Sequence, residues 1–270
     1  MADTDERPWH TKDDKPEKKT SLLREAVIII GCVLLITWLF QTFIGRQYVI
    51  PSESMESTLH GCAGCTNDRI MIDKLSYRFS DPEPGDVVVF KVPDSWGEGF
   101  LSPRSANPVV HGIQDAASWF GFAPPDENNF VKRVIAVGGQ TVECKNSENV
   151  GVKVDGKPLT EPYIDRALQE QNLAQGLVLD DALTADGKLN SCLGRDFGPL
   201  KVPEGDVWVM GDNRTRSSDS RYHTPLEVDP DYQAKKFDGM VPVDDIRGEA
   251  RFIIYPFSRI GGIGSINPQQ

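Results

Sequence analysis

The residues that could do chemistry lie in three short stretches of the chain. The first is "YVIPSESMESTLHGC", residues 48–62, in which three serines and a threonine lie between a proline and a cysteine. A solvated linker has this composition, and so does a loop that presents a serine nucleophile. A serine nucleophile needs a base. The four histidines lie in no recognisable triad signature and G-x-S-x-G is absent, so a histidine-dependent serine hydrolase has no support.

A lysine can replace histidine as the base. Removal from water lowers the pKa of a lysine, and a neutral amine can then take the proton of a serine hydroxyl. The second stretch, "NNFVKRVIAV", surrounds Lys132 with apolar residues, as such a base requires. Lys91 in "VVVFKVP" shows the same local pattern, and most strand lysines merely point to solvent. The pattern alone therefore does not assign the base.

The third stretch is "VWVMGDNRTRSSDSRYHTP", residues 207–225, where a strand pattern runs into a loop rich in Asp, Asn, Arg and Ser. Such residues are common in turns for local reasons. Charge of this density directly after a core strand also suits a hydrogen-bonded scaffold that orients a site. Both interpretations stay open on the residues alone.

A membrane anchor precedes all three stretches. Residues 26–44 contain no charge and match the about 20 residues that a helix needs to cross a bilayer. A cleaved secretory signal has a shorter apolar region, of about 7–15 residues, and a small-residue cleavage site, which is lacking here. Lysines and arginines gather before the run, and only Arg46 lies between it and Arg69. We therefore predict a disordered cytoplasmic tail over 1–25, a membrane helix over 26–44 and an extracytoplasmic segment over 45–270.

The segment beyond the membrane is expected to be mainly β. Short runs rich in Val, Ile and Phe, bounded by turn residues, predict strands; they are "RIMIDKL", "DVVVFKV", "FVKRVIAV", "TVEC", "GVKVDG", "DVWVMGD" and "ARFIIYP". Two loop-rich insertions are predicted at about 93–129 and 165–200, with a short helix possible within 162–185. The aromatic cluster Trp119, Phe120 and Phe122 is either a local packing core or a patch that rests on the lipid surface.

Charge and cysteine content narrow the possible partners and cofactors. The net charge of −11 argues against nucleic acid, which needs a basic face. Cys62 and Cys65 form a C-x-x-C that could be a redox pair, half a zinc site or a small disulfide loop, and no second C-x-x-C or histidine pair completes a zinc site. Cys144 and Cys192 would then pair with each other, which is one of three connectivities for four cysteines outside the membrane.

Six motifs together resemble a known family. They are "PSESMESTL", "DRIMIDK", "GDVVVFK", "KRVIAVGGQTVE", "GDNRTRSSDSR" and "PFSRIG". Their order, spanning about residues 50 to 261 behind an anchor, resembles that of the bacterial type I signal peptidases of the Ser-Lys class. The resemblance implies a largely antiparallel β catalytic domain, of a kind shared with repressor-type autoproteases.

Carried over by position, the resemblance implies a role for each motif residue. Ser54 would be the nucleophile and Lys132 its general base, while Ser52 and the backbone N–H of Ser54 would form the oxyanion hole. Ser217 would hydrogen-bond to Lys132 and orient it. Two ion pairs would brace the site, namely Asp219 with Arg221 and Asp212 with Arg133. No metal or nucleotide cofactor is implied.

The function that follows is removal of N-terminal signal peptides from exported preproteins, after an A-x-A site and through an acyl-enzyme, at the outer face of the cytoplasmic membrane. The implied partners are secretory preproteins, the lipid bilayer and the protein-export translocon. A catalytically inactive, membrane-anchored β binding domain is the main alternative. A repressor-type autoprotease would carry a DNA-binding domain in place of residues 26–44. A thiol redox protein using Cys62 and Cys65 lacks its βαβ surroundings.

Overall fold

The computed structural model describes residues 22–96, 102, 104–120, 123, 126–178, 180–224 and 239–270. Residues 1–21 of the predicted disordered tail lie outside the described part of the chain. The chain divides into two units, residues 1–37 and 38–270.

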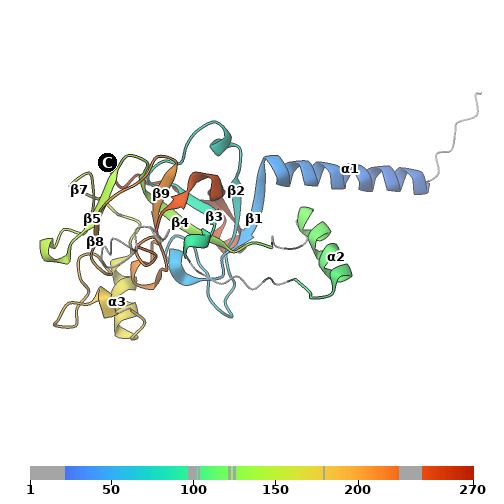
Figure 1. Cartoon of the computed structure of the whole chain (residues 1–270). Coiled ribbons are helices and arrows are strands. Elements are labelled where there is room, and N and C mark those ends of the chain that lie inside the picture. The colour runs from blue at the N-terminus through green and yellow to red at the C-terminus, as the bar shows by residue number, and fades with distance from the viewer. Residues whose placement is uncertain are drawn as a thin grey trace, which may run out of the picture. The chain divides into compact units, whose positions relative to one another are not determined.

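Helix α1, Leu22–Phe43, is the long blue helix of Figure 1. It is the one helix in the described part of the chain that is long and apolar enough to cross a membrane. None of its side chains is buried. The predicted apolar helix is therefore confirmed, although it starts four residues before the predicted position 26. Residues 38–43 at its end belong to the second unit.

The main sheet is antiparallel and has eight strands in the order β1-β2-β11-β3-β4-β9-β10, with β12 paired to β11. The strands are β1 Gly45–Val49, β2 Arg69–Asp73, β3 Val87–Lys91, β4 Asn129–Val137, β9 Asp206–Met210, β10 Val241–Pro242, β11 Ile246–Tyr255 and β12 Gly261–Gly262. Strand β4 lies between β3 and β9, and its core residues are buried because the sheet continues on both sides of it. The mainly β prediction is confirmed.

The second sheet is a smaller antiparallel one, in the order β7-β6-β5-β8. Its strands are β5 Thr141–Cys144, β6 Val152–Val154, β7 Lys157–Pro158 and β8 Phe197–Lys201. Phe197 stacks on Trp208 of the main sheet at a centroid distance of 5.2 Å. Strand β8 pairs with β5 and occupies the last residues of the insertion predicted at about 165–200.

Two further helices lie in the predicted insertions, α2 Pro108–Trp119 and α3 Arg166–Ala174 (Figure 1). Helix α3 falls within the range in which a short helix was expected. Helix α2 was missed, although Asn107 caps it and Pro108 occupies its first turn, which are standard start signals. Its apolar residues do not form a stripe that faces a core, and the sequence pattern therefore predicts only a loop-rich insertion here.

Short 3-10 turns connect these elements. They are η1 Glu53–Met55, η2 Ser76–Arg78, η3 Asp94–Trp96, η4 Asn146–Glu148, η5 Asp180–Ala182, η6 Arg214–Arg216, η7 Val243–Asp245 and η8 Phe257–Arg259. Turn η1 and the loop after it are packed against the main sheet through Met55 and Leu59. These two side chains are buried in one core cluster with strand residues such as Ile70 and Val89. Burying each such side chain stabilises the fold by about 1.5–3 kcal/mol, so this part of the chain is fixed against the sheet.

Candidate active site

Ser54 and Lys132 meet in the structure although 78 residues separate them. Ser54 lies on η1 and Lys132 on β4, and both are buried. Lys132 Nζ donates a hydrogen bond of 2.8 Å to Ser54 Oγ, and a second one of 3.2 Å to the Val131 carbonyl. A serine hydroxyl in direct contact with a buried amine has the geometry of a nucleophile–base pair.

The two candidate lysines have different surroundings. Strands β3 and β4 pair so that Val88 lies opposite Lys132, and Lys91 lies opposite Asn129 at the far end of the ladder. The Lys91 side chain is 42% exposed, and its amine is 4.0 Å from an Asp94 carboxylate oxygen. The position along the ladder thus distinguishes two lysines that look alike in sequence.

Ser52 lies beside the pair. It has an extended backbone conformation just before η1, and its Oγ is 3.3 Å from Ser54 Oγ. The two hydroxyls therefore converge on one point. They line a cavity of about 360 Å³ together with Lys132, and the apolar part of its wall includes Ile50 and Phe130.

A buried ion pair joins β4 to the loop after β9. The Arg133 guanidinium donates to Asp212 through Nε and Nη2, at 2.9 and 2.7 Å. Thr58 Oγ1 donates to the same carboxylate at 2.5 Å, and the guanidinium stacks over the Tyr163 ring at 4.1 Å. Because Thr58 follows the nucleophile segment, this cluster ties that segment to the strand that carries Lys132.

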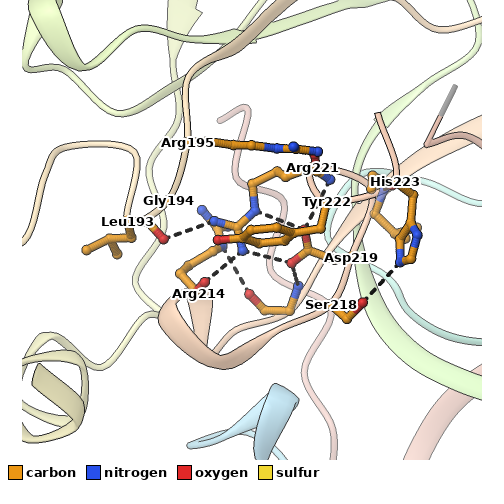
Figure 2. Close-up of polar contacts among 12 residues, drawn as sticks. Leu193, Gly194, Arg195, Arg214, Ser218, Asp219, Arg221, Tyr222 and His223 are labelled. Atoms are coloured by element: carbon orange, nitrogen blue, oxygen red, sulfur yellow. Dashed lines mark hydrogen bonds and ion pairs between the residues drawn. The ribbon is translucent and has the colours of Figure 1, made fainter. Parts of the chain in front are cut away.

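A second buried pair shapes the loop itself, as Figure 2 shows. Arg221 donates to Asp219 through Nε and Nη2, at 2.9 Å each, and to the carbonyl oxygens of Leu193 and Arg214. Asp219 also accepts from the Gly211 N–H at 3.0 Å. Burial alone would raise the pKa of Asp219, but the Arg221 guanidinium and the hydrogen bonds outweigh it, and the pKa is lowered. Both predicted ion pairs are thus formed in the structure.

The predicted hydrogen bond from Ser217 to Lys132 is not formed. Ser217 Oγ is buried and makes no hydrogen bond to Lys132; it lies beside the Asp219 carboxylate, whose pKa it helps to lower. It packs instead over Gly211. A Cβ on Gly211 would lie 2.2 Å from Ser217 Oγ and 2.4 Å from the Ser54 carbonyl oxygen. Only glycine lets the loop approach the nucleophile segment this closely.

Three residues that the sequence did not single out hold this loop in place. Asn213 donates through its side chain to the Glu53 carbonyl and through its backbone to the Ser54 carbonyl, both at 3.1 Å. On α3, Asn172 donates to Asn213 Oδ1 at 2.9 Å, and Gln169 accepts from Thr215 Oγ1 at 2.8 Å. All of these side chains are buried. Polar residues in a polar segment carry no sequence signal that would distinguish this role from solvation.

The cysteines outside α1 form two disulfides. Cys62 pairs with Cys65, and Cys144 with Cys192. Of the three uses considered for the C-x-x-C, the structure has the small disulfide loop. The longer crosslink joins β5 to the segment that contains α3.

The sequence profile of the family described as "Signal peptidase, peptidase S26" matches residues 23–255. The chain belongs to the signal peptidase family. It is 49% identical to signal peptidase I of Mycobacterium tuberculosis over 269 residues, which cover 100% of this chain and 84% of that protein. It is 48% identical to the probable signal peptidase I of Mycobacterium leprae over 256 residues, which cover 94% and 83%.

More distant relatives that are named signal peptidase I also match. Signal peptidase I of Bacillus amyloliquefaciens is 28% identical over 250 residues, covering 93% of this chain and 97% of that protein. A crystal structure of a signal peptidase I from Enterococcus faecalis is 22% identical, covers 63% of this chain and 97% of that chain, and has a TM-score of 0.32. The family profile and the mycobacterial relatives confirm the resemblance seen in the six motifs, and the chain is a peptidase of family S26.

Proposed function

We propose that this protein removes signal peptides from exported preproteins as a membrane-bound serine endopeptidase, with Ser54 as nucleophile and Lys132 as general base. The observation that carries the proposal is the 2.8 Å hydrogen bond from the Lys132 amine to Ser54 Oγ at the wall of a cavity. Membership of the signal peptidase family, with relatives named signal peptidase I, supports the substrate class.

Acylation begins when Ser54 Oγ attacks the carbonyl carbon of the scissile peptide bond. Its proton passes to the Lys132 amine, which has to be neutral at this step to accept it. The oxyanion of the tetrahedral intermediate is stabilised by the Ser52 hydroxyl and the Ser54 N–H. When the C–N bond breaks, Lys132 returns the proton to the leaving nitrogen, and the mature protein departs with a free amino terminus.

Deacylation repeats this chemistry with water. Lys132 takes a proton from a water molecule that attacks the ester carbonyl, and the proton then goes to Ser54 Oγ as the ester bond breaks. The signal peptide leaves as a carboxylate. A metal or nucleotide has no part in these steps.

Specificity for an A-x-A site is the second part of the proposal. The cavity beside Ser54 is lined in part by apolar residues such as Ile50 and Phe130, and small apolar side chains of a substrate would be accommodated there. The ion pairs Arg133–Asp212 and Asp219–Arg221 would keep the walls rigid. Ser217 would act on Lys132 only indirectly, by packing over Gly211 against the Ser54 segment.

The placement in the membrane follows from α1 and the charges around it. We propose residues 1–25 as a cytoplasmic tail, 26–44 as the membrane span and 45–270 as the extracytoplasmic catalytic domain in the cytoplasmic membrane. Lysines and arginines concentrated before the span support this orientation. Two disulfides beyond the span also suit an oxidising compartment. Preproteins, the bilayer and the export translocon are the partners that this placement implies.

The proposal is tested by cleavage of a preprotein with an A-x-A site by the full chain in detergent and lipid. Ser54→Ala and Lys132→Ala are expected to lose cleavage while remaining folded. Ser57→Ala and Lys91→Ala are the matched controls, because Ser57 is a nearby serine and Lys91 is the other lysine in an apolar strand. Both control variants should retain preprotein cleavage. Folded wild-type protein that leaves such preproteins intact would instead support an inactive binding domain. Full activity of Lys132→Ala would disprove its role as base.

A further inference from the structure

Helix α2 has its polar side turned toward the protein and its apolar side turned away. Val109, Ile113 and Trp119 are 70%, 64% and 65% exposed. The only buried side chain of the helix is that of Ser118. A surface helix in water normally buries its apolar stripe and exposes its polar face. The arrangement of α2 is the reverse.

The polar side of α2 is hydrogen-bonded to the flanking chain. Arg104 Nε donates to Asp115 at 3.1 Å, and Gln114 accepts from the Ser105 N–H at 2.9 Å. His111 Nε2 lies 4.0 Å from a carboxylate oxygen of Asp126, which follows the helix. These contacts determine which side of the helix faces inward, so a simple rotation that would hide the apolar side breaks them.

The C-terminal end of α2 is bound close to the point where the chain leaves α1. Arg46, on β1 and three residues after the end of α1, donates through Nη2 to the Ser118 carbonyl and hydroxyl oxygens, at 2.9 and 2.8 Å. Trp119 follows directly. The C-terminal end of α2, which includes Trp119, is therefore held near the region where the proposed membrane span ends.

Other residues at this exit have the character of a membrane interface. Lys74 Nζ donates to the carbonyl oxygens of Gln41 and Thr42 in the last turn of α1. The Arg78 guanidinium lies over the Phe43 ring at 5.1 Å, and the neighbouring Phe79 is 87% exposed. Cations that cap the end of a span beside exposed aromatic rings are typical of the headgroup level of a bilayer.

We propose that α2 is an interfacial helix whose outer side, formed by Val109, Val110, Ile113 and Trp119, contacts the lipid bilayer. The proposal rests on α1 spanning the membrane, which is part of the proposed function, and not on the catalytic roles of Ser54 and Lys132. It replaces the aromatic patch expected from sequence. Trp119 belongs to both, but Phe120 is half-buried and Phe122 lies outside the described residues.

The test uses the full chain in liposomes, with Cys32→Ser as background because Cys32 is the free cysteine of the described residues. Nitroxide labels are attached at Val109→Cys and Ile113→Cys, and at Lys188→Cys as the control on a largely exposed side chain. Collisions with dissolved oxygen, which concentrates in lipid, and with a water-soluble nickel chelate are then measured by electron paramagnetic resonance. We expect the α2 labels to be several-fold less accessible to nickel than the control and more accessible to oxygen.

Two results would overturn the proposal. Nickel accessibility at Val109 and Ile113 equal to that at Lys188 would place α2 in water. Shielding from both reagents, with dipolar broadening between labels, would mean that a second copy of the chain covers this side. The measurement does not depend on peptidase activity. A chain that fails to cut preproteins would therefore contradict the proposed function and leave the lipid contact to be decided by the labels.

Discussion

The helices of the two insertions, α2 and α3, bury the same kind of residue and expose different kinds. Helix α3 buries Gln169 and Asn172, and α2 buries Ser118, so both present polar groups to the protein. The outward side of α3 is also polar and includes Glu170, whereas that of α2 carries Ile113 and other apolar residues. The polar outer side of α3 therefore suits contact with water, and the apolar outer side of α2 suits the contact with lipid that we propose.

The two helices also differ in what their inward, polar sides contact. The polar groups of α3 reach the loop that supports Ser54, through Asn172 and Asn213. The segment that contains α3 is also crosslinked to β5 by the disulfide Cys144–Cys192, while the insertion at 93–129 contains no cysteine. We infer that the α3 insertion is part of the scaffold of the site and that the α2 insertion is an attachment to its surroundings. The following predictions test this contrast.

The largest effect is expected in the loop that α3 supports. Asp219→Asn should cost about 3–5 kcal/mol of unfolding free energy, because it leaves the buried Arg221 guanidinium without its counter-charge. Preprotein cleavage should fall with it. Chemical denaturation of the detergent-solubilised chain measures the loss. Asp186→Asn is the control, since its carboxylate is exposed.

The Asp219→Asn variant should also change how the stability of the fold depends on pH. The pKa of Asp219 is lowered in the fold from an ordinary value of 3.8. Its contribution is therefore fully present above pH 3.8 and is lost as the pH falls below that value through the folded pKa. Asp219→Asn should give a flatter loss of stability below about pH 4 than the wild type. An unchanged acid limb would contradict this role.

The second effect concerns the crosslink of the α3 segment. The double variant Cys144→Ser with Cys192→Ser releases a loop whose ends are 48 residues apart, and loop entropy predicts a loss of about 4 kcal/mol. The matched control is Cys62→Ser with Cys65→Ser, which opens a loop with a separation of 3 and should lose clearly less. Equal losses in the two double variants would mean that the crosslink does not anchor the insertion.

A smaller effect is expected from the contact between α3 and the loop. Asn172→Ala removes the donor to Asn213 and should cost about 1–3 kcal/mol. Because Asn213 holds the Glu53 and Ser54 carbonyls, kcat for preprotein cleavage should fall while KM changes little. Gln171→Ala, on the exposed side of the same helix, is the control. A variant that loses stability but retains kcat would show that Asn172 is structural only.

The smallest effect on stability is expected at α2. Ile113→Ser should change the unfolding free energy in detergent by no more than about 0.5 kcal/mol, because the side chain is exposed. Cleavage of a short peptide in detergent should also be unchanged. A destabilisation above 1 kcal/mol, which is typical of truncated core residues, would mean that this side of α2 packs on protein and would remove the contrast with α3.

Local patterns were enough for much of the fold. The apolar run of α1 and the Val- and Ile-rich runs of β3, β4 and β9 predicted a helix and strands correctly. These preferences depend on neighbouring residues in the sequence. The order of the six motifs was enough to recognise the family. Helix α2 was not predicted although its N-cap residue is visible in the sequence, because its apolar residues do not form the stripe by which a helix packs on a core.

Contacts between distant residues were decided only by tertiary structure. Lys91 and Lys132 have equivalent neighbours in sequence, and the place of each along the β3–β4 ladder determines which one meets Ser54. The roles of Asn172 and Ser217 likewise depend on how α3 and the loop pack. The sequence by itself determined the membrane helix, the central strands and the motif residues, because these are local properties. The tertiary structure decided which polar groups are buried together, because burial depends on segments that lie far apart in the chain.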